Sequence, residues 1–143
     1  MTSIVEISVE VELPELDEDE IRRVLLGTLE REGARMELSL AIVDDETIHA
    51  INRRFLDHDY PTDVISFDLG DGGGLEGEVV VSADTARREA LLRGTDPRGE
   101  LLLYCVHGTL HLLGWDDQDD DDRARMHARQ RELLAGFGYE TSE

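Results

Sequence analysis

The chain of 143 residues has no lysine, a single cysteine and only three prolines. All 14 basic residues are arginines, against 34 aspartates and glutamates, so the formal net charge is −20. Such a charge repels polyanions at long range and argues against a general nucleic-acid coat protein. It also suggests the hypothesis of a surface adapted to high salt, where charge repulsion is screened. Because Cys105 has no partner cysteine, no intrachain disulfide forms, which favours a reducing compartment.

Long hydrophobic segments are also missing. Residues 1–13 contain neither the basic nor the apolar region of a secretory signal. The longest apolar stretch, residues 101–113, contains two histidines and a tyrosine and is too short to cross a bilayer. We therefore expect a cytoplasmic protein that does not associate with membranes.

The chain does contain a regular succession of strand and helix patterns, within the length of a single domain. Alternating apolar residues predict strands, and apolar residues at helical spacing predict helices. The strands are expected at residues 3–13, 36–43, 63–69 and 78–82, and the helices at 21–33, 44–56, 83–94, 97–114 and 119–138. We therefore predict one α+β domain over residues 1–143, with about four strands and about five helices. The glycine-rich segment 70–77 precedes a strand rather than a helix, which indicates a hairpin connection and not a phosphate loop.

The segment HGTLHLLGWDD, residues 107–117, has the pattern of a metal site. His107 and His111 are four residues apart in a helix and therefore lie on one face, and Gly114 allows the chain to turn back. After that turn, Asp116 or Asp117 is close enough to supply a third ligand. Two imidazoles and one carboxylate suit zinc and leave a position for water, as in catalytic zinc sites. The spacing alone leaves open a hydrogen-bonded histidine pair without metal.

Three separate signatures resemble the YbeY endoribonuclease family. HGTLHLLGWDD matches the family motif His-Gly-x-Leu-His-Leu-x-Gly-x-Asp-His at every specified position except the last. FLDHDYPTDVISF, residues 55–67, is similar to the family stretch in which an aromatic residue and an arginine precede Lys-Asp-x-Pro-Thr-Asp-Val-Leu-Ser-Phe. LEGEVVVSADTA, residues 75–86, resembles the family's Leu-Gly-Asp-Ile strand that enters a helix.

The resemblance implies an α+β fold like that of zinc hydrolases, with a mixed sheet and the two-histidine helix in the core. It implies one zinc ion per chain, with His107 and His111 as ligands and Asp117 in place of the family's third histidine. Because aspartate is a harder ligand than imidazole, manganese or iron is a second expectation for the metal. Asp116 is the alternative third ligand. Otherwise it orients one of the metal ligands without contacting the metal itself.

The resemblance also implies a single-strand-specific endoribonuclease that acts in 16S rRNA 3′-end maturation and ribosome quality control, with RNA and the ribosome or its proteins as partners. Two positions depart from the family. Leu56 stands where the family has arginine, and His58 stands where it has lysine. We therefore expect Arg53 and Arg54 to supply the missing charge, and Ser66 to line the substrate site.

Two other functions stay open from the sequence. A metal-dependent hydrolase of another substrate, such as a peptide, is disfavoured because Gly108 stands where His-Glu-x-x-His peptidases carry their general base. A non-catalytic ribosome-assembly factor with a structural metal is favoured by the loss of the family arginine at Leu56. The residue that performs the proton transfers of catalysis is not identifiable from the motif, beyond a water activated by the metal.

Overall fold

The computed structural model describes residues 3–56, 62–70 and 76–140. These residues form four strands and five helices, as predicted. The elements, in chain order, are β1 (Ile4–Val9), α1 (Glu18–Arg31), β2 (Glu37–Val43), α2 (Asp45–Leu56), β3 (Val64–Asp68), β4 (Glu76–Ser82), α3 (Ala83–Arg93), α4 (Pro97–Leu112) and α5 (Asp120–Gly136).

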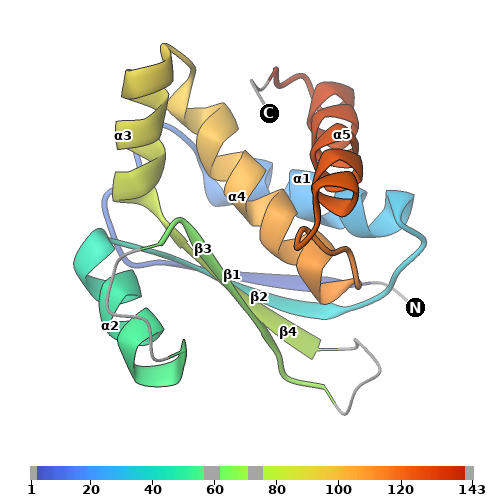
Figure 1. The fold of residues 1–143 in the computed structure, drawn as a ribbon. Helices are drawn as coiled ribbons and strands as arrows, with labels where there is room; N and C mark the ends of the chain where they lie inside the picture. The colour runs from blue at the N-terminus through green and yellow to red at the C-terminus, as the bar shows by residue number, and fades with distance from the viewer. Residues whose placement is uncertain (1–2, 57–61, 71–75, 141–143) are drawn as a thin grey trace.

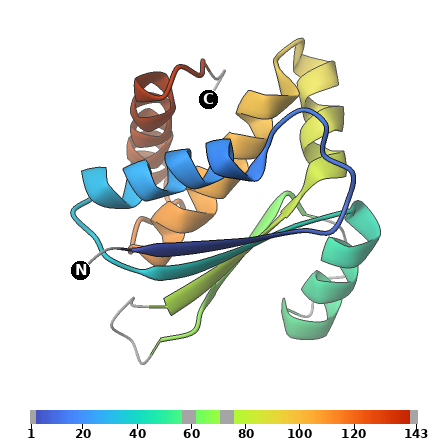
Figure 2. The same cartoon turned by 180° about the vertical axis from the view of Figure 1, so that it is seen from behind.

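The strands form one mixed sheet in the order β1-β2-β4-β3. β1, β2 and β4 run parallel, and β3 pairs antiparallel with β4 at the edge of the sheet. Helices α1, α4 and α5 lie on one side of this sheet and α2 lies on the other (Figures 1 and 2). The antiparallel pairing of β3 with β4 agrees with the predicted hairpin, although residues 71–75 of its connection lie outside the described part of the chain.

The first strand is shorter than the predicted range 3–13. β1 pairs only with β2, and their register ends where Val9 lies opposite Ile42. The Glu10 N–H still donates to the Ile42 carbonyl at 2.9 Å, but β2 ends one residue later, so the chain beyond has no strand to pair with. Alternation of side chains alone does not show where a partner strand stops.

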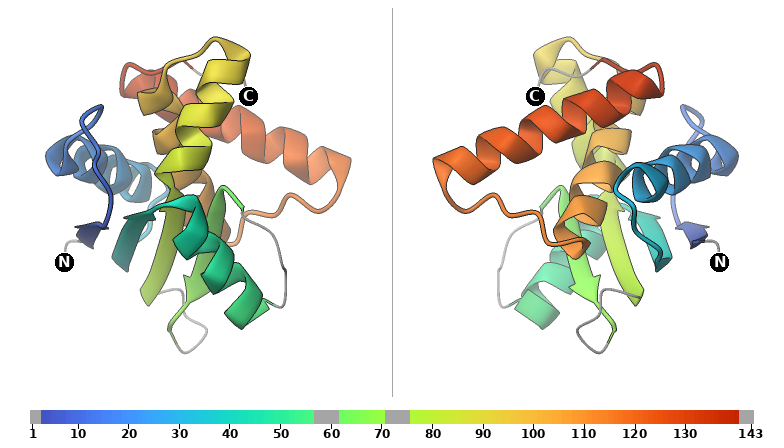
Figure 3. Two further views of the ribbon diagram at one scale, coloured as in Figure 1. Left: turned by 90° about the vertical axis from the view of Figure 1, so that its left-hand side faces the viewer. Right: turned by 90° about the vertical axis from the view of Figure 1, so that its right-hand side faces the viewer.

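The helix that carries the histidines runs through the middle of the molecule. α4 has eleven buried residues and packs against β3 and β4 on one side and against α1, α3 and α5 on the others (Figure 3). Its apolar character on almost every face is what a buried helix requires. Cys105 belongs to this core, and burial raises the pKa of its thiol to about 12, which agrees with an inert thiol.

Gly108 lets α4 approach the sheet closely. A Cβ atom at this position would lie 2.7 Å from Val79 Cγ1 and 3.0 Å from both Ser66 Oγ and Val64 Cγ2. Because the helix and the strand are this close, the Ser66 hydroxyl donates a hydrogen bond of 2.9 Å to the Gly108 carbonyl. The edge strand β3 is thereby fixed against the helix segment that bears both histidines. None of the described helices is both long enough and apolar enough to span a membrane.

Candidate metal centre

His107 and His111 lie one turn apart on the same face of α4, as their spacing predicts. Their ring centroids are 4.6 Å apart and their planes meet at 84°. Both side chains are partly buried, with 19% of the His107 side chain and 32% of the His111 side chain exposed. One end of each ring therefore faces a space that solvent or a substrate reaches, while the rest is enclosed by protein.

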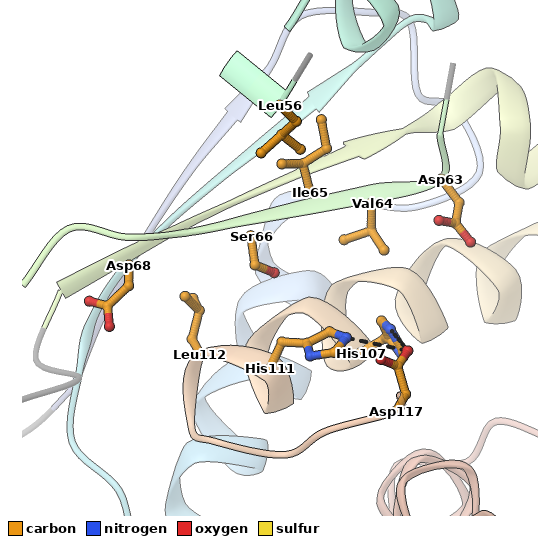
Figure 4. A pocket seen from close by; sticks show the side chains of 10 residues that line it. All are labelled: Leu56, Asp63, Val64, Ile65, Ser66, Asp68, His107, His111, Leu112 and Asp117. Carbon is orange, nitrogen blue, oxygen red and sulfur yellow. Dashed lines mark ion pairs between the residues drawn. The ribbon is translucent and has the colours of Figure 1, made fainter. Parts of the chain in front are cut away.

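The turn after α4 brings a carboxylate back over the histidines. Gly114 has a positive φ of 100°, its N–H donates to the His111 carbonyl, and the Trp115 N–H donates to the Leu110 carbonyl. These two hydrogen bonds form a Schellman motif, which ends the helix and reverses the chain. As a result, Asp117 Oδ2 lies 3.5 Å from Nε2 of His107 and 3.5 Å from Nε2 of His111 (Figure 4).

Asp116 has a different position from Asp117. Its carboxylate accepts hydrogen bonds from the backbone N–H groups of Asp117, at 2.8 Å, and Gln118, at 3.2 Å, and the residue is exposed. These bonds hold the turn that carries Asp117. Among the described residues, the group that could hold a metal ion is His107, His111 and Asp117, whose ligand atoms all lie within 4.8 Å of one another.

The second nitrogen of each imidazole has a hydrogen-bond acceptor. His107 Nδ1 lies 2.5 Å from Oε1 of Gln130, and His111 Nδ1 lies 3.1 Å from the carbonyl oxygen of Trp115. Because a carbonyl oxygen only accepts, each Nδ1 carries the proton and each Nε2 keeps its lone pair. Burial lowers the pKa of His107, which further favours the neutral imidazole. Both rings are thus held in the tautomer and orientation that a metal ligand needs.

The spacing of the donor atoms fits a tetrahedral metal ion. Ligands that bind zinc at about 2.0–2.1 Å in tetrahedral geometry lie about 3.4 Å from one another. Asp117 Oδ2 lies 3.5 Å from each Nε2, and all three ligand atoms lie within 4.8 Å of one another, so these residues could hold such an ion. Three protein ligands of this kind leave a fourth position for water or substrate.

The three residues open into a pocket of about 510 Å³. The pocket passes around the edge strand, because Ser66 on one face of β3 and Ile65 on the other both line it (Figure 4). The described residues that line it are Leu56, Asp63, Val64, Ile65, Ser66, Asp68, His107, His111, Leu112 and Asp117. No arginine is among these described residues, whereas three of them are aspartates. The pocket is therefore acidic and suits a cation.

Of the residues predicted to bind substrate, Ser66 lines the pocket and the two arginines of α2 do not. Ser66 lines the pocket, with its hydroxyl proton directed to Gly108. Arg53 and Arg54 are exposed in the last turn of α2 and are not part of the pocket lining, although Leu56 of the same turn is. His58, at the position of the family's lysine, lies outside the described residues.

Gln130 is the residue of this centre that sequence reasoning missed. It lies on α5, 23 residues after His107 in the chain, and is 1% exposed. The sequence does contain a signal: Gln130 is four residues from both Met126 and Leu134, which are buried on the same helix. A polar residue in an apolar stripe of a helix needs a buried partner. The pattern does not tell which partner it is.

A second network ties the turn after α4 to the two flanking helices. The Trp115 indole N–H donates to Oε1 of Glu32 at 2.6 Å, and Nε of Arg129 donates to Oε2 of the same carboxylate at 2.7 Å. Trp115 supplies the carbonyl that faces His111, and Arg129 precedes Gln130, which faces His107. Glu32 therefore connects the segments that orient both histidines.

Comparisons with known proteins show the family to which the chain belongs. The family model for endoribonuclease YbeY matches residues 6–138. An endoribonuclease YbeY from Rhodopirellula baltica is 44% identical over 125 residues, which cover 85% of this chain and 64% of that longer protein. The one from Chloroherpeton thalassium is 38% identical and covers 96% of each chain. The solution structure of TM1509 from Thermotoga maritima has the same fold, with a TM-score of 0.72 and 24% identity over 94% of this chain and 89% of its own. The chain belongs to the YbeY endoribonuclease family.

Proposed function

We propose that the chain is a metal-dependent endoribonuclease that cleaves single-stranded RNA, with one zinc ion held by His107, His111 and Asp117. The observation that carries this proposal is the spacing of 3.5 Å between Asp117 Oδ2 and each histidine Nε2, in a pocket large enough for substrate. Because one ligand is a carboxylate oxygen, manganese or iron is the alternative to zinc.

The residues of the chain prepare this centre for hydrolysis of a phosphodiester. When bound, a zinc ion with an open position supplies Lewis acidity and activates water near neutral pH. Gln130 and the Trp115 carbonyl hold the two rings, so the ligands need not reorganise. Asp63 and Asp68 line the pocket on either side of Ser66 and add negative charge that attracts the cation.

Ser66 is suited to the ribose rather than to the phosphate. Its hydroxyl proton is already donated to the Gly108 carbonyl at 2.9 Å, so the oxygen has only lone pairs to offer in the pocket. A ribose 2′-hydroxyl is a donor, whereas a phosphate oxygen is not. In this proposal Ser66 accepts a hydrogen bond from the substrate ribose, which favours RNA over DNA.

The phosphates of the substrate need cations from outside the pocket lining. Arg53 and Arg54 are exposed at the end of α2, in the same turn as the pocket residue Leu56. In this proposal these two arginines contact phosphates that flank the cleaved bond. Such local contacts matter in a chain whose net charge of −20 otherwise repels RNA.

The biological role follows the family resemblance in the sequence. The proposed role is 16S rRNA 3′-end maturation and ribosome quality control in the cytoplasm, by a single domain over residues 1–143 that acts on the ribosome or with its proteins. Docking on a ribosomal partner would bring the acidic chain to an RNA that its own long-range field repels.

Cleavage of a labelled single-stranded RNA tests the proposed activity. We expect zinc-loaded protein to cleave the RNA, EDTA to stop the reaction, and the His111→Ala variant to be inactive while still folded. Casein, incubated in parallel, should stay intact, because residue 108 faces the sheet and supplies no carboxylate to the site. Cleavage that is unchanged by EDTA and by His111→Ala would overturn the proposal.

One observation favours a second candidate function. The absence of arginine among the described residues that line the pocket is unusual for a phosphodiesterase, and it favours a ribosome-assembly factor whose metal is structural. In that case zinc would raise the melting temperature of the protein, but the zinc-loaded protein would leave RNA intact. The same cleavage assay therefore separates the two candidates.

A further inference from the structure

An exposed aromatic ring lies at the end of α2, beside the metal pocket. Phe55 is 61% exposed, and the next residue, Leu56, is 40% exposed and lines the pocket. The chain has only seven aromatic residues, of which three are phenylalanines. An exposed ring beside a pocket offers apolar surface and a flat face to a bound ligand.

The neighbours of Phe55 hold its ring in place. The ring of Phe67, on β3, meets it edge to face, with the centroids 6.0 Å apart and the planes at 78°. The guanidinium carbon of Arg54 lies 5.3 Å from the centroid of the Phe55 ring. The ring is thus oriented by an aromatic contact and accompanied by a cation, while most of its surface stays accessible.

We propose that Phe55, supported by Arg54 and Phe67, is a stacking platform for a nucleobase of the single-stranded RNA substrate. This inference rests on the proposed function and adds a base-binding subsite to it. Proteins that hold single strands without reading their sequence combine exposed aromatic rings, on which bases stack, with arginines that contact the backbone. Arg53, Arg54 and Phe55 present that combination within one helical turn, next to the pocket.

The observations favour a base over a protein partner. Interfaces between proteins bury roughly 800 Å² on each side around several apolar anchors. Phe55 follows the exposed Arg53 and Arg54, and Leu56 is its one apolar neighbour in the chain. The largest exposed apolar pair of the described residues lies elsewhere, at Leu91 and Leu92 of α3, which are 84% and 74% exposed. An aromatic ring with a cation beside it suits a nucleotide, because the base stacks on the ring and the cation contacts the phosphate.

The test is the binding of a fluorescein-labelled single-stranded oligoribonucleotide to the full chain in EDTA, followed by fluorescence anisotropy. We expect Phe55→Ala to raise the Kd at least about five-fold. Phe55→Tyr keeps the ring and should stay within two-fold of wild type, whereas Phe55→Leu keeps the apolar surface but should behave like Phe55→Ala. Leu91→Ala is the matched control, because it also removes an exposed apolar side chain, and it should leave the Kd unchanged.

An abasic version of the oligoribonucleotide completes the test. With a platform for bases, wild type should bind the abasic strand about as weakly as Phe55→Ala binds the intact one. A Kd that is equal for wild type and Phe55→Ala, or no saturable binding by wild type, would overturn the platform; in the first case the ring would belong to a protein interface. RNA that binds through Phe55 but is not cleaved with zinc would instead overturn the proposed activity and keep the platform.

Discussion

The Nδ1 atom of His107 lies 2.5 Å from the Oε1 atom of Gln130, a side chain that is almost fully buried on α5. The two residues come from different helices, and their contact decides which nitrogen of His107 is free for a metal. The Trp115 carbonyl does the same for His111 at 3.1 Å. The orientation of the ligands is therefore a property of the packed fold rather than of the motif alone.

Replacement of Gln130 should weaken the metal site without touching a ligand. Gln130→Leu removes the acceptor for the His107 Nδ1 proton, and we expect the zinc Kd to rise about 10- to 100-fold. The unpaired buried N–H should also lower the free energy of unfolding by about 1–3 kcal/mol. Competition with a chromophoric chelator measures the first effect. Gln130→Glu should keep tight binding, and Gln118→Leu, on the exposed turn, is the control. Wild-type zinc affinity in Gln130→Leu would contradict the assigned orientation.

Gly108 should tolerate no side chain. Gly108→Ala places a Cβ atom 2.7 Å from Val79 Cγ1, and we expect a loss of about 1–3 kcal/mol in stability from overpacking, despite the better helix propensity of alanine. Gly99→Ala in the same helix is the matched control, because among the described residues its Cβ would meet only the Glu140 carbonyl, at 3.5 Å. Urea unfolding of both variants measures the difference. Equal stabilities would show that α4 does not approach the sheet this closely.

The Trp115–Glu32 hydrogen bond should stabilise the turn but not supply a ligand contact. Trp115→Phe removes the indole N–H and keeps the backbone carbonyl that faces His111. We expect a loss of about 1–3 kcal/mol in stability, since the bond is to a charged acceptor, with a zinc Kd within a few-fold of wild type. Thermal unfolding followed by circular dichroism measures the stability. A much larger loss of zinc affinity than of stability would give the indole a direct role at the centre.

Glu20 should make the attachment of the C-terminal segment sensitive to acid. Hydrogen bonds from Arg23 and from the Tyr139 hydroxyl lower the pKa of Glu20 to about 2 in the folded chain, against a usual value of 4.5. The folded pKa is the lower one, so this stabilisation is present above pH 4.5 and is lost as the pH falls toward 2. Glu20→Gln should cost about 1 kcal/mol at pH 7 and nothing near pH 2. Asp19→Asn, whose side chain is 98% exposed, is the control in thermal unfolding at both pH values. A difference that persists at pH 2 would contradict the assignment.

The parts of the centre that could be predicted are those that are local in the sequence. His107, His111, Gly114 and Asp117 fall within eleven residues, so helix geometry and one turn suffice to bring them together. The strands and helices were predicted to within a few residues for the same reason. The end of β1 was not, because it depends on where its neighbour β2 ends.

The contacts that orient the ligands could not be predicted, because they join segments far apart in the chain. Gln130 is 23 residues from His107, and Glu32 is 83 residues from Trp115. The tight approach at Gly108 likewise depends on Val79 and Val64 of two strands. Local patterns show that such residues are polar or small, and only the packing of helices on the sheet shows what they meet.

Equilibrium zinc binding tests the central claim most directly. We would titrate the metal-free chain with zinc against a chromophoric chelator, with Asp117→Ala and its neighbour Asp116→Ala in parallel. The account predicts one equivalent of zinc for wild type and for Asp116→Ala, and a loss of at least 100-fold in affinity for Asp117→Ala. Folded wild-type protein that binds no zinc, manganese or iron, or a site lost in Asp116→Ala but kept in Asp117→Ala, would contradict it.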